Sequence, residues 1–302
     1  MASNNVTLTP ASAATWLPPT GITLLDSVEM WGGGGSGAST SLSTTAGGGG
    51  GGGAYSKNTS IVCNPAVPFS ILVGQGGAAG SGNANGNNGA NTTFTHSNGT
   101  LLMRAEFGQR GLRTNVAGAG GTTGGVGATK FAGGAGAAGV NATGVGGGGG
   151  AGACNAATGA AASGNTGGAG AGGGGTGGEG GLSNANGTNG AIPGAGGGGS
   201  GNNTAGTRAP GTGANGSILI TWTEKTLSGV SRDKDGYVLP NTLCYCFKYN
   251  GGSPIYCGSN TSNGSGVYTF TVSGEASDYF VVFFKDDATH IMDVTDHVLA
   301  AV

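Results

Sequence analysis

Residues 47–57 read GGGGGGGAYSK, and a second run of five consecutive glycines spans residues 146–150. These runs have no side chains that could pack into a core, so any order in them has to come from hydrogen bonds between backbone groups. A helix is disfavoured, because each interior glycine costs about 1 kcal/mol relative to alanine. The runs belong to a block, residues 32–216, that holds 64 of the 73 glycines in the chain.

The composition of the whole chain narrows the class of protein. Only 11 basic and 13 acidic residues occur among 302, about a third of the usual charged fraction. The net charge of −2 and the lack of a basic cluster exclude nucleic acid as an expected partner. No apolar run approaches the roughly 18 residues of a membrane-spanning helix, so we expect no membrane insertion. The start of the chain lacks the features of a signal peptide, which predicts synthesis in the cytoplasm.

The segments on either side of the glycine block have the composition of β-strands. Residues 22–31 follow a Pro-Pro pair and are rich in apolar and β-branched side chains, and residues 217–223 have the same character. We expect these two strands to tie the ends of the block together. Inside the block, residues 69–73 and 101–107 are shorter strand-like islands.

The glycine block itself fits neither collagen nor a flexible linker. Collagen needs glycine at every third position with abundant proline, whereas consecutive glycines occur here and the chain has nine prolines. A linker of about 185 residues would be exceptional. The remaining conformation is a left-handed extended helix with three residues per turn and no internal hydrogen bonds. Several such polyglycine II helices can bond to one another side by side, and small residues allow the close approach.

The last part of the chain, residues 226–302, reads as all-β. Strand composition occurs at residues 243–249, 255–257, 267–272 and 279–284. The first two of these flank residues 250–253 (NGGS), a hairpin signal. Several strands in so short a piece predict a small β-sandwich. The expected fold is therefore all-β with polyglycine II helices: a glycine-rich bundle framed by short strands, followed by a small β-sandwich.

Four motifs occur in order along the glycine-rich part. They are residues 28–35 (VEMWGGGG), 47–57, 70–77 (SILVGQGG) and 216–222 (GSILITW). With these motifs, residues 15–224 resemble the glycine-rich domain of many phage tail proteins, and a related arrangement occurs in the ectodomain of some animal receptor kinases. The resemblance implies a bundle of polyglycine II helices framed by short strands, in agreement with the physical interpretation.

Three motifs carry a second resemblance, namely residues 227–236 (LSGVSRDKDG), 266–270 (GVYTF) and 279–282 (YFVV). They resemble the carboxypeptidase-regulatory, transthyretin-like domain, and the ending at residues 291–298 (IMDVTDHV) is similar to phage-encoded versions of it. The resemblance implies a non-catalytic module. The expected organisation is an N-terminal arm at residues 1–14, a glycine-rich domain at 15–224 and a transthyretin-like β-sandwich at 225–302.

We expect no catalytic residues, no metal site and no cofactor. The Gly-x-Gly-x-x-Ala match at residues 74–79 lacks the helix and the acidic residue of a dinucleotide site. None of the three histidines, His96, His290 and His297, has the sequence context of a nucleophile elbow. Residues 233–236 (DKDG) read as a plain β-turn, because the downstream glutamate of a calcium loop is missing.

The five cysteines have irregular spacing and fit neither a disulfide framework nor a zinc site. Cys246 and Cys257 lie at equal distances from the Gly251-Gly252 turn, so they would face each other across a hairpin at a separation compatible with a disulfide. Synthesis in the cytoplasm favours free thiols at both positions instead.

The leading functional hypothesis is a phage virion protein of a tail fibre, tail tip or surface appendage, whose bundle displays loops for host attachment. Tyr55, Phe94, His96 and Phe131 are the candidate contacts with a host cell-surface receptor. We favour an alternative interpretation over receptor contact, namely that these four side chains cap the lattice of polyglycine II helices. The expected partners are other virion proteins, such a receptor and further copies of the chain, in a homo-oligomer or as multiple copies in a virion.

Three other functions remain as alternatives. A capsid decoration or head-fibre protein would have a mechanical role and no receptor. An extracellular adhesive protein of a cell is disfavoured by the missing signal peptide. A polysaccharide-cleaving enzyme is the weakest alternative, because its acid pair would have to come from Glu106 and Glu179, the two acidic residues of the block.

Overall fold

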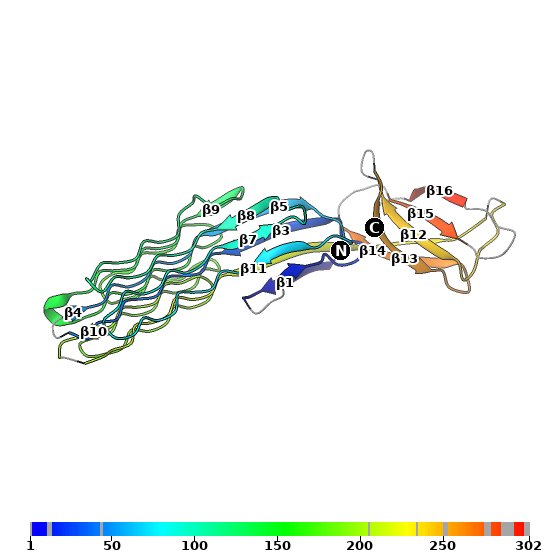
Figure 1. Cartoon of the computed structure of the whole chain (residues 1–302). Coiled ribbons are helices and arrows are strands. Elements are labelled where there is room, and N and C mark those ends of the chain that lie inside the picture. The colour runs from blue at the N-terminus through cyan, green and yellow to red at the C-terminus, as the bar shows by residue number, and fades with distance from the viewer. Residues whose placement is uncertain are drawn as a thin grey trace.

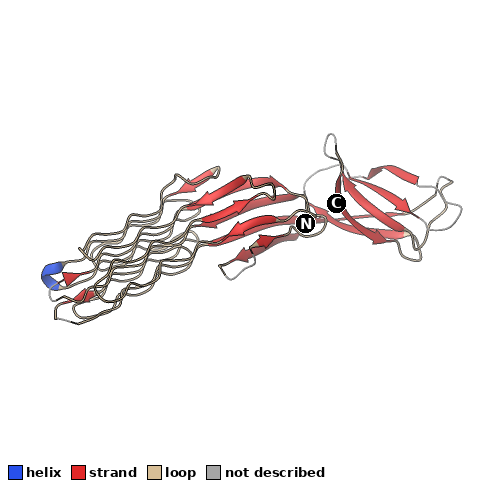
Figure 2. Cartoon of the chain, in the orientation of Figure 1, coloured by secondary structure: helices blue, strands red, loops and turns tan. Residues whose placement is uncertain are grey.

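The computed structural model describes residues 2–10, 14–42, 45–204, 206–233, 235–249, 253–274, 279–284 and 293–298. Along the long axis of the molecule, a bundle of glycine-rich segments is followed by packed sheets and then by a further sheet at the other end (Figure 1). Figure 2 draws most of the bundle as loop, because its extended segments do not pair as strands.

The described residues contain sixteen strands and one short helix, which confirms the predicted all-β class. The elements are β1 (Ala2–Leu8), β2 (Thr15–Trp16), β3 (Leu24–Trp31), β4 (Thr45–Ala46), β5 (Tyr55–Val62), β6 (Phe69–Leu72), β7 (Thr92–Thr95), β8 (Leu101–Ala105), β9 (Thr129–Phe131), the 3₁₀ helix η1 (Asn141–Thr143), β10 (Gly201–Asn202), β11 (Ser217–Val230), β12 (Leu243–Lys248), β13 (Ile255–Thr261), β14 (Val267–Ser273), β15 (Tyr279–Phe284) and β16 (Asp293–Val298).

All the strand pairs are antiparallel. The largest sheet has the order β1-β11-β3-β5-β9, with β14 also paired to β11. A second sheet has the order β2-β6-β7-β8, a third has the order β13-β12-β15-β16, and β4 pairs with β10 alone.

Strand β11 connects the glycine-rich part to the C-terminal part. Its first residues pair with β3, with Ile218 opposite Met30, which confirms that the predicted strands on either side of the block tie its ends together. From Glu224 to Val230 the same strand pairs with β14. The strand therefore runs without interruption through the expected domain boundary after residue 224.

The first two sheets pack face to face around a hydrophobic core. This core takes side chains from both sheets: Leu8, Ile22, Leu25, Val28, Met30, Cys63, Phe69, Ile71, Val73, Phe94, Met103, Ala105, Ile218, Ile220 and Trp222. Burial of large apolar side chains is the main stabilising term available to the chain, because the adjoining glycine-rich segments contribute almost none. The two sheets therefore anchor the bundle that extends from them.

Within the bundle, the hydrogen-bond partners of an extended segment change with every residue and repeat after three. Along residues 32–38, the first, fourth and seventh amides donate to residues 48–54. The second and fifth donate to residues 84–90, and the third and sixth to residues 211–214. A strand in a sheet alternates with a period of two and reaches only two neighbours, so these segments are not strands of a sheet.

Residues 47–54, which include the seven-glycine run, lie at the centre of the bundle. Their amides donate to residues 106–112, 134–137 and 194–200, and their carbonyls accept from residues 32–38, 118–121 and 147–153. The segment thus has six neighbours, and its backbone groups are satisfied without a single side chain.

The neighbours approach so closely that only glycine fits at the contacts. A Cβ atom on Gly50 would overlap the carbonyl group of Gly35, whose carbon would lie 2.5 Å away. The glycines of residues 47–53 all meet backbone atoms in this way. Close backbone approach, and not flexibility, is therefore what the glycines of the central segments provide.

The C-terminal part has a buried cluster of its own, formed by side chains of β11 and β14 and of the sheet that contains β12. The cluster consists of Leu227, Cys244, Cys246, Cys257, Tyr268, Phe270, Val272, Tyr279, Val281 and Phe283. The predicted hairpin is formed, since β12 pairs with β13. Residues 250–252 of its predicted turn, 250–253, lie outside the described residues.

We expect the substitution Gly50→Ala to destabilise the protein by more than about 3 kcal/mol, because the added methyl group forces two backbones apart. The melting temperature should fall by roughly 10 °C. The control is Gly124→Ala, whose nearest contacts would be side-chain atoms of Glu106 and Thr122, at 3.2 Å or more, and not backbone. Equal melting temperatures for the two variants in a calorimetric scan would show that the close packing is wrong.

Candidate functional site: the tip of the bundle

The tip is the end of the bundle that lies away from the sheets, where β4, β10 and η1 are found (Figure 1). It is formed by the turns that reverse the glycine-rich segments. These are residues 40–42, 45–46, 81–83, 113–116, 140–145, 182–184, 201–204 and 206–208. Loops on a rigid framework are the usual location of binding residues.

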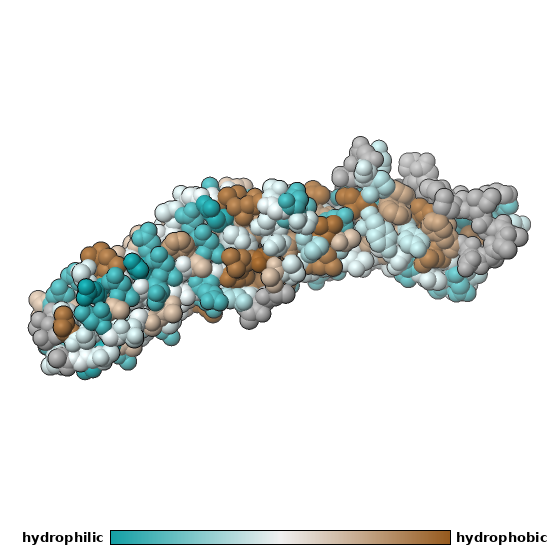
Figure 3. Space-filling model, in the orientation of Figure 1, coloured by the Kyte–Doolittle hydropathy of each residue, from teal (hydrophilic) through white to brown (hydrophobic). Residues whose placement is uncertain are grey.

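Large aliphatic side chains are exposed on the turns of the tip. Leu42, Val116, Val140 and Leu182 are between 47% and 61% exposed. Polar residues such as Thr114 stand beside them, and Figure 3 shows small brown areas among teal ones at this end of the molecule. Isolated exposed aliphatic residues are ordinary, but four on the turns of one end form a mixed apolar and polar surface suited to contact with a partner.

Side chains of asparagine hold the turns of the tip to one another. The Asn184 Oδ1 atom accepts hydrogen bonds from the amides of Asn203 (3.0 Å) and Thr204 (2.9 Å), and the Asn184 carbonyl accepts one from Arg208 Nε (2.8 Å). In another turn, Asn141 Oδ1 accepts from the amide of Ala46 at 3.0 Å. These bonds fix the turns in place before any partner arrives, which lowers the entropic cost of binding.

Asparagine also completes the hydrogen bonding at the edges of the bundle. Asn85, Asn88 and Asn91 accept from the amides of Arg113, Arg110 and Phe107 at distances of 3.0, 2.9 and 3.0 Å. Asn186 and Asn189 accept in the same way from Ala209 and Thr212, at 2.9 Å in both cases. Sequence reasoning missed this role, although the signal was present: the asparagines recur at every third residue, the period of the hydrogen-bond pattern.

Two of the four side chains expected to contact a receptor, Tyr55 and Phe131, lie instead at the end of the bundle next to the sheets. Tyr55 is 1% exposed and packs between Trp31 and Phe131, with ring centroids 5.2 and 6.1 Å away. Trp31 Nε1 donates to the carbonyl of Ala153 at 2.9 Å. Burial and the nearby Glu29 carboxylate raise the pKa of Tyr55. Tyr55 is not available to a receptor, and its position fits the alternative expectation of a lattice cap.

The other two expected contacts belong to the core between the sheets. Phe94 is fully buried and stacks on Phe69 at 4.5 Å, so its assignment to a receptor surface is wrong. His96 is half-buried and lies edge-on to the Phe69 ring at 5.8 Å. Nothing in the local sequence distinguishes a core aromatic residue from an exposed one, which is why sequence reasoning could not separate core from surface.

Cys246 and Cys257 lie close together, and both thiols are buried. A bulge in β13 places Gly258 opposite Cys246, with Cys257 beside it, so the two are not directly opposed as the spacing suggested. The neighbouring Cys257 thiol and burial raise the pKa of Cys246, and burial raises the pKa of Cys244 to about 11. These are inert core thiols in the structure.

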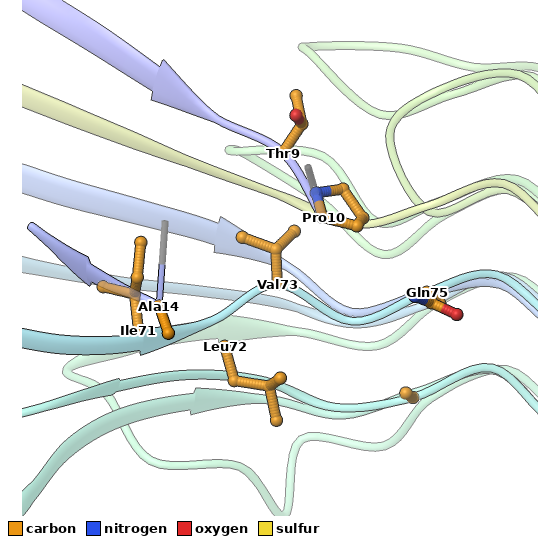
Figure 4. A pocket seen from close by; sticks show the side chains of 8 residues that line it. Thr9, Pro10, Ala14, Ile71, Leu72, Val73 and Gln75 are labelled. Atoms are coloured by element: carbon orange, nitrogen blue, oxygen red, sulfur yellow. The ribbon is translucent and has the colours of Figure 1, made fainter. Parts of the chain in front are cut away.

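Few of the described residues have the arrangement that catalytic chemistry requires. A pocket of about 290 Å³ lies between the end of β1 and the end of β6 (Figure 4). It is lined by Thr9, Pro10, Ala14, Ile71, Leu72, Val73, Gln75 and Ala90, none of which is acidic or basic. Glu106 is ion-paired with Arg104 at 3.2 Å, and Glu179 is an exposed residue of a different segment. His290 and the side chain of His297 lie outside the described residues.

The described part of the chain contains no group of three or more His, Cys, Asp and Glu side chains placed to hold a metal ion. It also contains no helix with the length and apolar character needed to cross a membrane.

The fold and the tip define an elongated, all-β, glycine-rich scaffold with ordered turns at one end. The family described as "Glycine-rich domain" matches residues 8–223, more than two thirds of the chain, and the protein belongs to this family. No curated protein matches the chain.

We expect Asn184→Ala to loosen one side of the tip without unfolding the bundle. Each lost hydrogen bond contributes about 1 kcal/mol, so the amides of Asn203 and Thr204 should each exchange with solvent about fivefold faster. Hydrogen exchange measured by mass spectrometry tests this. Asn83→Ala, in another turn of the tip, is the control and should leave the exchange of residues 203 and 204 unchanged. An unaltered exchange rate in Asn184→Ala would refute the anchoring role.

The raised pKa of Cys244 predicts a loss of stability at alkaline pH. Below the ordinary pKa of 9.0 the thiol is protonated in both states, and its contribution is constant. Between 9.0 and about 11 the unfolded thiol ionises while the folded one does not, so the free energy of unfolding falls. Urea unfolding over this range should show a smaller decrease for Cys244→Ala than for the unmodified protein. The same decrease in both proteins would contradict the assignment.

Proposed function

We propose that the protein is a structural component of a phage virion, in a tail fibre, tail tip or surface appendage. In this proposal the glycine-rich bundle is a rigid rod whose tip contacts a receptor on the surface of the host cell. The observation that carries it is the tip itself, where exposed aliphatic side chains stand on turns fixed by asparagine. The ordered motifs shared with the glycine-rich domain of phage tail proteins support the assignment to a virion.

The glycine-rich segments are proposed to be polyglycine II helices. The three-residue repeat of hydrogen-bond partners supports this geometry, as do the six neighbours of residues 47–54. A β-strand forms hydrogen bonds in only two directions and would leave every third residue without a partner. The backbone groups of an α-helix bond to one another within the same helix. Neither conformation fits the observed partners. Such a bundle resists bending, because each segment is bonded to its neighbours along its length. Rigidity and scarce charge suit a part that projects from a particle into variable ionic conditions.

The C-terminal part is proposed to be a small transthyretin-like β-sandwich that docks on other virion proteins or on further copies of the chain. The buried cluster shared by β11, β14 and the sheet of β12 supports two packed layers. Because β11 continues from one part into the other, a load on the sandwich passes directly to the bundle. The function proposed is mechanical and adhesive, with no catalytic step, no cofactor and no nucleic acid. Its location is the virion, after synthesis in the host cytoplasm.

The test uses phage particles that carry this chain with the double substitution Val140→Asp and Leu182→Asp. Both side chains are exposed, at 47% and 61%, so folding should be unaffected. A desolvated, unpaired carboxylate at a contact costs several kcal/mol, so adsorption to host cells should fall at least about tenfold. The control is Leu17→Asp, an exposed residue at the sheet end of the bundle.

Two measurements on these particles separate the proposal from the decoration alternative. Cryo-electron microscopy gives the position of the chain, which should be distal on a tail or appendage with its tip outward. Normal adsorption by the double variant, combined with density spread over the capsid, would replace host attachment with a decoration role.

A further inference from the structure

Two neighbouring strands of the C-terminal part, β12 and β15, are largely apolar on both faces. In β12, Cys244 and Cys246 are buried on the inner face, while Tyr245 and Phe247 alternate with them and are half-exposed on the outer face. Strand β15 has the same pattern over its whole length, YFVVFF. When one face of an antiparallel sheet is solvated, its strands usually alternate apolar inward with polar outward residues. The outer face therefore has a chemistry that the fold alone does not explain.

On three of the four strands of this sheet, β13, β12 and β15, the register arranges the outer face in three rows of three residues. The side chains of the fourth strand, β16, lie outside the described residues. The rows are Thr261, Leu243 and Phe284; Ser259, Tyr245 and Val282; and Tyr256, Phe247 and Phe280. Paired residues of antiparallel strands point to the same side. None of the nine is charged, and four carry hydroxyl groups. We call this surface the aromatic platform.

Five rings of the aromatic platform form one connected cluster. Phe247 stacks on Phe280 with centroids 5.3 Å apart and contacts Tyr256 at 5.6 Å. Tyr245 contacts Tyr256 at 6.2 Å and Phe284 at 5.2 Å. Tyr256 and Phe284 remain 40% and 41% exposed. The rings support one another in fixed orientations, so the platform is formed before any ligand arrives.

The size and chemistry of the platform favour a small neutral ligand. Three strands cover about 10 Å across and three rows about 14 Å along, at the usual strand spacings. With the fourth strand, β16, the width is about 14 Å, and the area is still well below the roughly 800 Å² per partner that a stable protein interface buries, which argues against a second copy of the chain. The absence of charge among these nine side chains argues against phosphate or carboxylate groups, which are bound by Arg and Lys.

We propose that the aromatic platform binds a neutral polysaccharide of a cell surface. The apolar C–H face of a sugar ring fits against an aromatic ring, while its hydroxyl groups bond to those of Tyr245, Tyr256, Ser259 and Thr261. About two consecutive sugar rings cover the platform. This inference rests on the proposed function only for the source of the polysaccharide, and it assigns a second site, separate from the tip.

The experiment titrates the full chain with maltohexaose, cellohexaose and chitohexaose, and with polygalacturonic acid as an anionic probe, by calorimetry and saturation-transfer NMR. At least one neutral hexasaccharide should bind, and the anionic probe should not. Tyr256→Ala should weaken the binding by about tenfold, because it removes the exposed ring that contacts both Phe247 and Tyr245. Tyr256→Phe keeps the ring and should weaken it less. Tyr237→Ala, at a tyrosine that is 72% exposed outside the platform, is the control and should bind normally.

Each other result overturns the proposal. It fails if no neutral hexasaccharide binds, if the anionic probe binds equally well, or if Tyr256→Ala and Tyr256→Phe, both shown to be folded by circular dichroism, bind as the unmodified chain does. A dimer that dissociates on Tyr256→Ala, seen by light scattering, would assign the platform to a second copy. Adsorption by the tip variants is measured independently, so the two proposals can fail separately.

Discussion

The hydrogen bonds between backbones of neighbouring glycine-rich segments are the interaction on which this molecule depends. They require carbonyl and amide groups to meet with no side chain between them, as where the Gly35 amide donates to the Gly51 carbonyl at 2.9 Å. Each of these bonds contributes modestly, about 1 kcal/mol net, but a buried backbone group left without a partner costs more than that. The bundle is stable only when all segments are in register, so its order is cooperative. Asparagine side chains supply the acceptors that are missing at its edges.

A bundle of this kind has almost no hydrophobic stabilisation, and the remainder of the chain compensates for it. The large side chains are gathered where the segments enter the sheets, in the core around Phe94 and in the cluster of Trp31, Tyr55 and Phe131. These clusters hold the first residues of each segment at fixed positions, which reduces the entropy lost when the glycines become ordered. Strand β11 then carries the same framework into the C-terminal part.

The two surfaces proposed for binding differ in origin. The tip consists of short turns whose residues can vary without disturbing the lattice that positions them. The aromatic platform is the outer face of a sheet, and its residues are constrained by their neighbours in the cluster.

Composition and periodicity were enough to predict the all-β class, the strands on either side of the glycine block and their pairing, because each depends on local residue types. The three-residue spacing of the asparagines was also present in the sequence. The burial of Phe94 and Tyr55 depended on the tertiary structure, since nothing local distinguishes a core aromatic from an exposed one. The same holds for the bulge beside Cys257, the continuation of β11 past residue 224 and the platform around Tyr256. Each is decided by strand register, which places side chains on one face or the other only when distant segments meet.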